Sequence, residues 1–179
     1  MRTQTGIQPF NEREADNLSS HKGFVFGKDM TFGEFIEYSI ENKDKTARFY
    51  FGKLSKEFAD RIEAATGKNV ENYIVAINST EIRHILNEHG DSVSKSTLQQ
   101  LPNVFNNPDE IMKSPVLDSA MRIAFAIKKK INGYSIVVNG ISEGRMTIQI
   151  DTLWTINRNA SLIQIIESTK KRRSTTFNV

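Results

Sequence analysis

The dipeptide Asn132-Gly133 restricts what this chain can fold into more than any other feature, because it separates two runs typical of β-strands. Asn-Gly favours the two-residue turns that join antiparallel strands, since both residues tolerate positive φ. The flanking runs are residues 122–131 and 134–140, and residues 145–157 form a third run after another reversal. The second half of the chain is therefore predicted to be a three-stranded antiparallel meander.

The turn also predicts which side chains share a face of that meander. A two-residue turn would pair Ile131 with Tyr134 and Ile127 with Val138, which gathers the apolar residues on one face, with Lys129 among them. The other face would then carry cations, amides and hydroxyls. Such a face is either simply solvated or suited to holding a phosphate backbone. Its members are Arg122, Lys128, Lys130, Ser135, Asn139, Gln149, Asp151 and Thr155.

The first half of the chain alternates helical and strand patterns. Helices are predicted over residues 30–42, 55–66 and 78–90, and strands over residues 47–54 and 73–77. Thr31 with Glu34, and Asn78 with Glu81, have the spacing of capping boxes. The proline-containing stretch that follows is expected to be a connecting segment with short turns. Together these elements predict an α+β fold, with N-terminal helices followed by an antiparallel β-sheet meander.

The length of 179 residues suits one domain with extensions. The predicted organisation is a flexible arm over residues 1–22, a helical extension over 23–46, an α+β domain over 47–170 and a basic tail over 171–179. Residues 159–170 fit either a short helix or a strand. Two basic runs, Lys128–Lys130 and Lys170–Arg173, suit either phosphate contacts or solvated surface.

Composition excludes several classes of site. The chain has no cysteine, which excludes disulfides, thiolate zinc sites and cysteine nucleophiles. No apolar run approaches the ~20 residues that span a bilayer, and the N-terminus has no apolar segment of a secretory signal. We therefore expect a cytoplasmic protein with no membrane partner.

Two of the three histidines, His84 and His89, lie five positions apart within one predicted helix. Five positions place them ~140° apart around a regular helix, whereas zinc-binding helices usually space their pair four apart. A metal site is therefore disfavoured, and no cofactor is predicted. An imidazole titrates near pH ~6.5, so both rings are candidates for proton transfer. The plainer interpretation makes His84 a surface residue and His89 a half-buried helix cap.

Several segments together resemble a known family. They are RHILNEHG at residues 83–90, PDEI at 108–111, VVNG at 137–140 and IQIDTLW at 148–154. They resemble the phage-associated nuclease-like domains of the barnase–EndoU–colicin–RelE superfamily, over roughly residues 48–170. The resemblance implies helices followed by a sheet whose open face carries the active site. It also implies metal-independent cleavage of RNA, as in a toxin of phage or mobile-element origin.

The resemblance and the strand pattern give a set of candidate site residues. The candidates for catalysis are His84, His89, Thr155 and Thr169, of which the histidines match the family motif. The candidates for substrate binding are Arg83, Lys128, Lys130, Gln149, Thr152, Ser168 and Lys170. Strict alternation puts Thr152 on the apolar side, so only a β-bulge would turn it outward. The sequence offers no counterpart of a fixed catalytic glutamate.

The predicted mechanism is attack of the RNA 2′-hydroxyl on the adjacent phosphorus, with histidines as acid and base. The expected partner is RNA, either tRNA or mRNA, with an immunity protein or a phage structural protein as further candidates. The expected location is the bacterial cytoplasm, with delivery by a phage as one route. Two alternatives stay open: a nuclease-fold module that binds nucleic acid or protein without catalysis, and a metal-dependent enzyme.

Overall fold

A computed structural model describes residues 6–19, 24–26, 30–90, 93–131 and 133–167 of the chain. The helices are α1 (Glu12–Ser19), α2 (Phe32–Glu41), α3 (Lys56–Thr66), α4 (Ser79–Glu88), α5 (Lys95–Gln99) and α6 (Leu101–Val104). The strands are β1 (Ile7–Gln8), β2 (Phe24–Phe26), β3 (Arg48–Leu54), β4 (Ile74–Asn78), β5 (Glu110–Lys113), β6 (Ala124–Lys130), β7 (Tyr134–Ser142) and β8 (Thr147–Ile156). Residues 162–167 are also helical.

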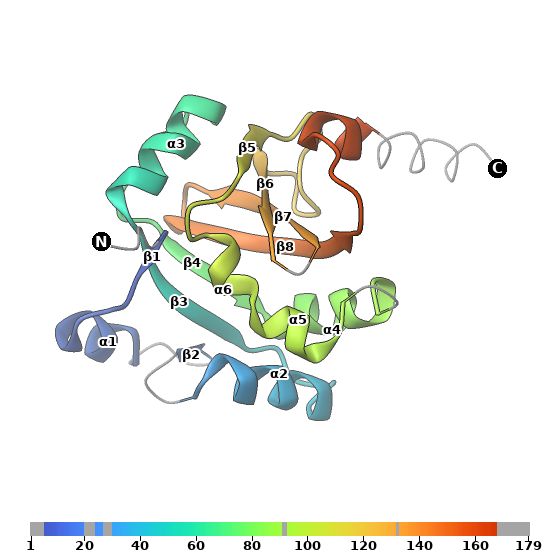
Figure 1. Cartoon of the computed structure of the whole chain (residues 1–179). Helices are drawn as coiled ribbons and strands as arrows, with labels where there is room; N and C mark the ends of the chain where they lie inside the picture. Colours follow the sequence, from blue (N-terminus) through green and yellow to red (C-terminus); the bar gives the residue numbers. More distant parts are fainter. Residues whose placement is uncertain (1–5, 20–23, 27–29, 91–92, 132, 168–179) are drawn as a thin grey trace.

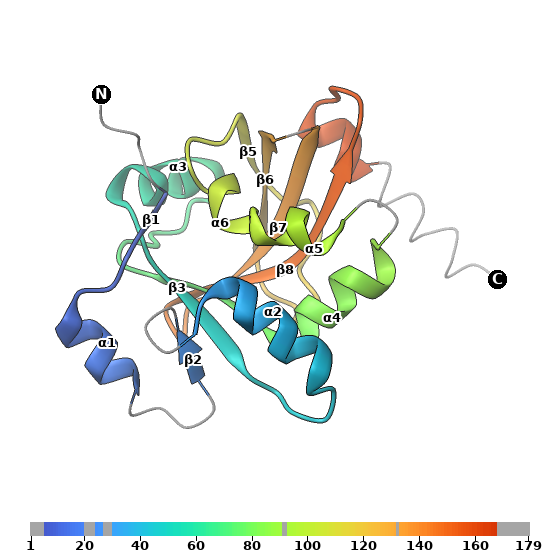
Figure 2. The same cartoon turned by 60° about the horizontal axis from the view of Figure 1, so that its bottom comes forward.

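One mixed sheet organises the fold, in the order β1-β3-β4-β8-β7-β6-β5, with β2 paired to β3. The α+β class is confirmed, but the purely antiparallel sheet is wrong, because β4–β8 and β2–β3 are parallel pairs. The parallel pair arises because the chain passes through α4–α6 and β5–β7 before β8 returns beside β4. Figure 2 shows that β3 and β8, towards different sides of this sheet, run in clearly different directions, so the sheet is curled.

The predicted meander is confirmed as β6, β7 and β8, but the two-residue turn is wrong. Lys130 pairs with Tyr134, so residues 131–133 form the connection. Gly133 has a φ of 109°, within the range that glycine tolerates best. The register differs by one residue from the predicted one, so the side chains of β7 lie on the opposite face, relative to β6, from the one predicted.

Both faces of the meander are buried, and the prediction assumed only one. Ile127 and Val137 face the main core, whereas Ala126 and Ile136 face a second core that packs against residues 162–167. A strand buried on both faces carries consecutive apolar residues, as β7 does in its Ile-Val-Val run. The chain after β8 therefore forms a helix that covers the sheet face predicted to be open.

The predicted polar face does not form a single surface. The side of the main core carries Ser135, Asn139 and Thr155. The opposite side carries Lys128, Lys130 and Gln149. The cations and hydroxyls that were expected together are therefore separated by the sheet itself.

The helices begin and end largely where their sequence signals place them. Thr31 and Glu34 form a complete capping box at α2, and Ser55 caps α3, which ends at Gly67 with φ 78°. The capping box predicted for α4 is wrong: in the described part of the chain the Asn78 side chain makes no capping hydrogen bond. In Figure 1, α2, α4 and α5 gather at one end of the sheet and α3 lies at the other.

Two regions contain more structure than the sequence patterns indicated. Residues 6–19, within the expected arm, contain β1 and α1, and Ala15 of α1 is buried against β3 and β4. The connecting segment contains α5, α6 and the edge strand β5. None of the helices described here combines the length and the apolar character that crossing a bilayer requires.

Candidate functional site

The candidate site lies where α4 runs beside the second half of β8. β4 pairs with β8 only as far as Ala76 and Gln149, and α4 follows β4 and packs on the remainder of β8. Ile82 and Ile85 anchor α4 in the main core. Helical spacing places Glu81 and His84 together on one flank, since residues three apart are neighbours on a helix surface. This flank of α4 carries the candidate site.

The two histidine rings meet because α4 ends between them. α4 stops at Glu88, and His89 is its C-cap with φ −120° and ψ 16°. The ring centroids of His84 and His89 lie 6.3 Å apart in an edge-to-face arrangement, and the His89 ring stacks on Trp154 of β8 at 6.1 Å. Termination of the helix thus removes the geometric obstacle that a regular helix would impose on the pair.

The two rings differ in environment. His84 is exposed and His89 is half-buried. Burial lowers the pKa of His89 below its ordinary value, and the nearby His84 lowers it further, against the opposite effect of Glu88. The pKa shift therefore favours a neutral His89 ring beside Trp154.

Glu81 has a pKa shifted from the ordinary range of a carboxyl group to near neutrality. Burial is the largest cause that raises the pKa of Glu81 to about 7, and the negative charges of Asp151 and Asp118 contribute to this rise against the opposing charge of Arg122. A carboxyl group that titrates near neutrality can give or take a proton at physiological pH. Sequence reasoning missed Glu81 because its spacing from Asn78 was interpreted as a capping box; its position three residues before His84 was the available signal.

The segment before β6 delivers Asp118 and Arg122 to this site. The Asp118 side chain is fully buried, and its Oδ2 accepts a hydrogen bond from Arg122 Nε at 2.8 Å. Asp118 Oδ1 accepts from the backbone N–H groups of Ala120 and Arg122, which fixes the segment locally. Asp118 lies directly on Gly140 of β7, where an added Cβ would approach Asp118 Oδ2 to 1.7 Å. The close approach of this carboxylate therefore requires glycine at position 140.

A β-bulge in β8 contributes the remaining carboxylate. Val138 pairs with Thr152 and Asn139 pairs with Ile150, which leaves Asp151 as the extra residue. The hydroxyl of Ser119 donates to Asp151 Oδ1, which links the bulge to the segment before β6. The bulge that Thr152 was expected to need is thus present. Thr152 is nevertheless buried, and its Oγ1 has no hydrogen-bond partner among the described residues.

The candidate cations of the sequence analysis lie elsewhere. Arg83 lies ~100° around α4 from His84. It donates through Nη1 to the Ser39 carbonyl at 3.0 Å and so ties α4 to α2. Lys128 is buried, donates to the Ala160 carbonyl at 2.8 Å and pairs with Glu110. These contacts hold helices and the C-terminal segment in place.

The other candidates are dispersed. Lys130 is exposed at the end of β6, away from α4 in the strand order, whereas Gln149 is buried and donates to Thr147 Oγ1 at 2.9 Å. Thr155 lies half-buried on the main-core side of β8. Ser168, Thr169 and Lys170 lie outside the described residues. Of the candidates that are described, the site brings together His84 and His89.

The donor set at the site is suited to proton transfer. Three carboxyl groups surround one guanidinium, so an approaching anion would meet least repulsion when Glu81 is protonated. Within the described ranges, no group of three or more histidine or acidic side chains is arranged to hold a metal ion.

Comparison with known proteins identifies a family. A family model, PBECR3, described as a phage-Barnase-EndoU-ColicinE5/D-RelE like nuclease 3, matches residues 52–162. The matched range begins in β3 and ends at the start of the helix after β8, so it includes α4, the bulge and the segment carrying Asp118 and Arg122. Neither a curated protein nor a solved structure matches the chain.

Proposed function

The chain belongs to the phage-Barnase-EndoU-ColicinE5/D-RelE like nuclease 3 family, and from this premise we propose that it is a metal-independent endoribonuclease. Its substrate is RNA, whose 2′-hydroxyl attacks the adjacent phosphorus. The O2′–P bond forms, the P–O5′ bond breaks, and the products carry a 2′,3′-cyclic phosphate and a 5′-hydroxyl. The observation that carries the proposal is the neighbouring pair of proton-transfer groups on one flank of α4, the half-buried Glu81 and the exposed His84.

We assign the base to His84 and the acid to Glu81. Side chains three residues apart on a helix have Cβ atoms ~5–6 Å apart, a separation that allows them to reach the attacking and leaving oxygens of one phosphodiester. His84, the exposed ring, takes the proton from the 2′-hydroxyl. Glu81, which stays largely protonated up to its pKa of about 7, gives a proton to the departing 5′-oxygen. Glu81 thus carries the proton that its role requires up to about pH 7.

Arg122 is the cation of the site, and Asp118 sets its position. A guanidinium suits the non-bridging phosphate oxygens, because it donates through several N–H groups of fixed geometry. Its Nε is held by Asp118, so the terminal nitrogens are the ones that would approach phosphate. The protonated form of Glu81 lowers the negative charge that this phosphate encounters.

His89 is a positioning residue in this proposal. Its ring lies between His84 and Trp154, and its lowered pKa keeps it neutral, so it adds no competing charge beside His84.

The test compares the wild-type protein with two variants and two matched controls, using total RNA in EDTA. His84→Ala and Glu81→Gln should each lose ~100- to 10,000-fold in cleavage rate, as expected for the loss of one acid or base. Asn87→Ala, an exposed position on α4, and Glu63→Gln, an exposed position on α3, should retain full activity. RNA left intact by the wild type, or equal activity in all variants, would contradict the proposal. Activity that EDTA abolishes and a divalent metal restores would favour a metal-dependent enzyme.

A second candidate, a binding module without catalysis, is favoured by one observation. Lys128 and Arg83 are engaged in internal contacts, and carboxyl groups outnumber the guanidinium around Glu81, so the described part of the site offers little positive charge to stabilise the transition state of cleavage. A protein of this kind would bind RNA or DNA with strong salt dependence and release no product. A filter-binding titration at two salt concentrations, run beside the cleavage assay, separates the two candidates.

A further inference from the structure

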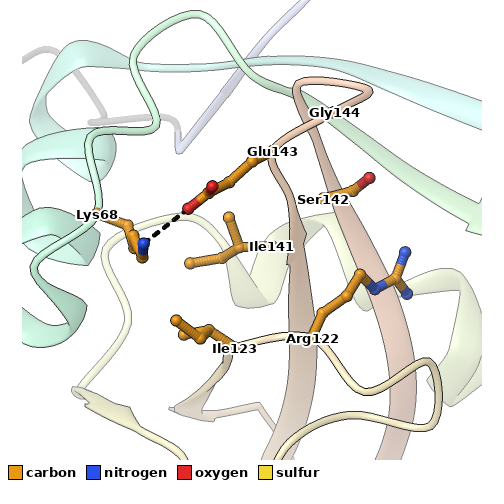
Figure 3. Close-up of a pocket in the computed structure, with 7 residues that line it drawn as sticks. All are labelled: Lys68, Arg122, Ile123, Ile141, Ser142, Glu143 and Gly144. Atoms are coloured by element: carbon orange, nitrogen blue, oxygen red, sulfur yellow. Dashed lines mark ion pairs between the residues drawn. The ribbon is translucent and has the colours of Figure 1, made fainter.

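A pocket at the end of β6 and β7 has the chemistry of a nucleobase site. It has a volume of about 360 Å³, within the range of ~300–1,000 Å³ typical of small-molecule sites. Ile123 and Ile141 form its apolar floor, and residues 142–144 of the β7–β8 hairpin form one wall. Figure 3 shows Lys68, from the connection between α3 and β4, opposite this hairpin with its ammonium directed at Glu143.

The polar groups of the pocket form an ion pair that is easily exchanged. Lys68 Nζ lies 2.9 Å from Glu143 Oε1, and the two side chains are 38% and 60% exposed. An ion pair this exposed contributes little to stability, so a ligand can replace it at small cost. In Figure 3 both charged ends lie beside Ile141, on the same side of β7, so they can address one edge of a ring placed on the apolar floor.

Arg122 connects this pocket to the proposed active site. Arg122 lines the pocket, and the positive charge of its guanidinium lowers the pKa of Glu81. Figure 3 shows its guanidinium on the opposite side of β7 from the Ile141 side chain. β6 pairs with β7 as far as Ala124 and Gly140, and Ile141 donates to the Ile123 carbonyl at 2.8 Å, so Arg122 lies at the end of the paired region, beside both the pocket and the site.

We propose that this pocket binds a guanine base that flanks the scissile phosphodiester, an inference that rests on the proposed function. Guanine presents two adjacent N–H donors, N1–H and N2–H₂, beside the O6 acceptor. The two oxygens of Glu143 accept from these donors, and Lys68 donates to O6. Adenine, cytosine and uracil each lack this arrangement of two adjacent donors and one acceptor.

The first measurement is calorimetric binding of 5′-GMP, 5′-AMP, 5′-CMP and 5′-UMP to the full chain. GMP should bind about 10- to 100-fold more tightly than the others, the discrimination typical of a bidentate base contact. Glu143→Gln and Lys68→Ala should remove that preference. The matched controls are Glu37→Gln and Lys95→Ala, which alter another exposed ion pair, also 2.9 Å long, away from the pocket. These controls should retain it.

The second measurement is cleavage of short RNAs that contain a single guanine. The wild type should cut beside guanine, and Glu143→Gln should cut all sequences at similar rates with the same product ends. Equal binding of the four nucleotides, or an effect of Glu143→Gln no larger than that of Glu37→Gln, would overturn the guanine site. Cleavage without guanine preference would overturn it and leave the proposed function standing. Selective GMP binding without cleavage would uphold the pocket and overturn the ribonuclease.

Discussion

The imidazole of His89 stacks on the indole of Trp154, with ring centroids 6.1 Å apart and planes inclined by 29°. This contact joins the end of α4 to β8, two elements separated by most of the second half of the chain. It fixes the orientation of the C-cap ring against which the His84 ring lies. The site therefore depends on a long-range aromatic contact as much as on the local sequence of α4.

Trp154 fluorescence should report the titration of His89. Trp154 is the only tryptophan of the chain, and a protonated imidazole in ring contact quenches indole emission. Because burial and His84 lower the pKa of His89, emission should fall only below the ordinary histidine range of ~6.5. His89→Ala should remove the transition. A transition above pH ~6.5 in the wild type, or one that persists in His89→Ala, would contradict the described contact.

Glu81 should make the stability of the protein depend on pH around neutrality. A carboxyl group with a raised pKa binds its proton more tightly in the folded state, so its contribution is present at low pH and lost as pH rises through about 7. The melting temperature of Glu81→Gln, relative to wild type, should therefore increase between pH 5 and pH 9. Glu63→Gln on α3 serves as the control, and a difference for Glu81→Gln that stays constant across this range would argue against the raised pKa.

Gly140→Ala should disturb the site through Asp118 and its partner Arg122. The new Cβ would lie 1.7 Å from Asp118 Oδ2 and 3.1 Å from Arg122 Nε, so the carboxylate must move. We expect a stability loss of ~1–3 kcal/mol from overpacking, and a fall in kcat/KM of about 100-fold from misplacement of Arg122. Gly33→Ala in α2, where the nearest atom to the added Cβ is the side-chain amide of Gln99 at 3.2 Å, is the control for both. Unchanged activity in Gly140→Ala would remove Arg122 from the mechanism.

Lys128 should matter for stability and little for RNA binding. Removal of its partner in Glu110→Gln leaves a buried ammonium, and the cost should be about 1–3 kcal/mol, below the ~3–5 kcal/mol of a fully buried pair because Glu110 is partly exposed. Lys128→Met, which removes the charge and keeps the volume, should be close to neutral in urea denaturation. A large loss of RNA affinity in Lys128→Met would contradict this and support the substrate-binding role predicted for Lys128 from the sequence.

Local signals in the sequence predicted the elements well and the contacts between distant elements poorly. The capping box of Thr31 and Glu34, the stop at Gly67 and the three-strand meander all depend on neighbouring residues, and all three are present. The register of β6 and β7 depends instead on the helix at 162–167, which buries the second face of the sheet. A turn signal alone could not reveal that helix.

The site itself was only half visible in the sequence. His84 and His89 are neighbours in the chain, so their association could be considered directly. Asp118 and Arg122 reach Glu81 because Gly140 of β7 has no side chain. The Asp118 carboxylate occupies the space that a Cβ at position 140 would fill. That relationship is tertiary, and no periodicity or spacing in the sequence encodes it.

The most direct test of the account uses an RNA oligonucleotide and the same oligonucleotide with 2′-deoxyribose at the cleaved nucleotide, both in EDTA. The proposed mechanism predicts that the protein cleaves the first to a 2′,3′-cyclic phosphate and a 5′-hydroxyl, and leaves the second intact. It also predicts that Glu81→Gln and His84→Ala cleave the RNA oligonucleotide ~100- to 10,000-fold more slowly than the wild type and leave the deoxy-substituted one intact. Cleavage of the deoxy-substituted oligonucleotide at the same position, or cleavage of the RNA by both variants at the wild-type rate, would contradict it.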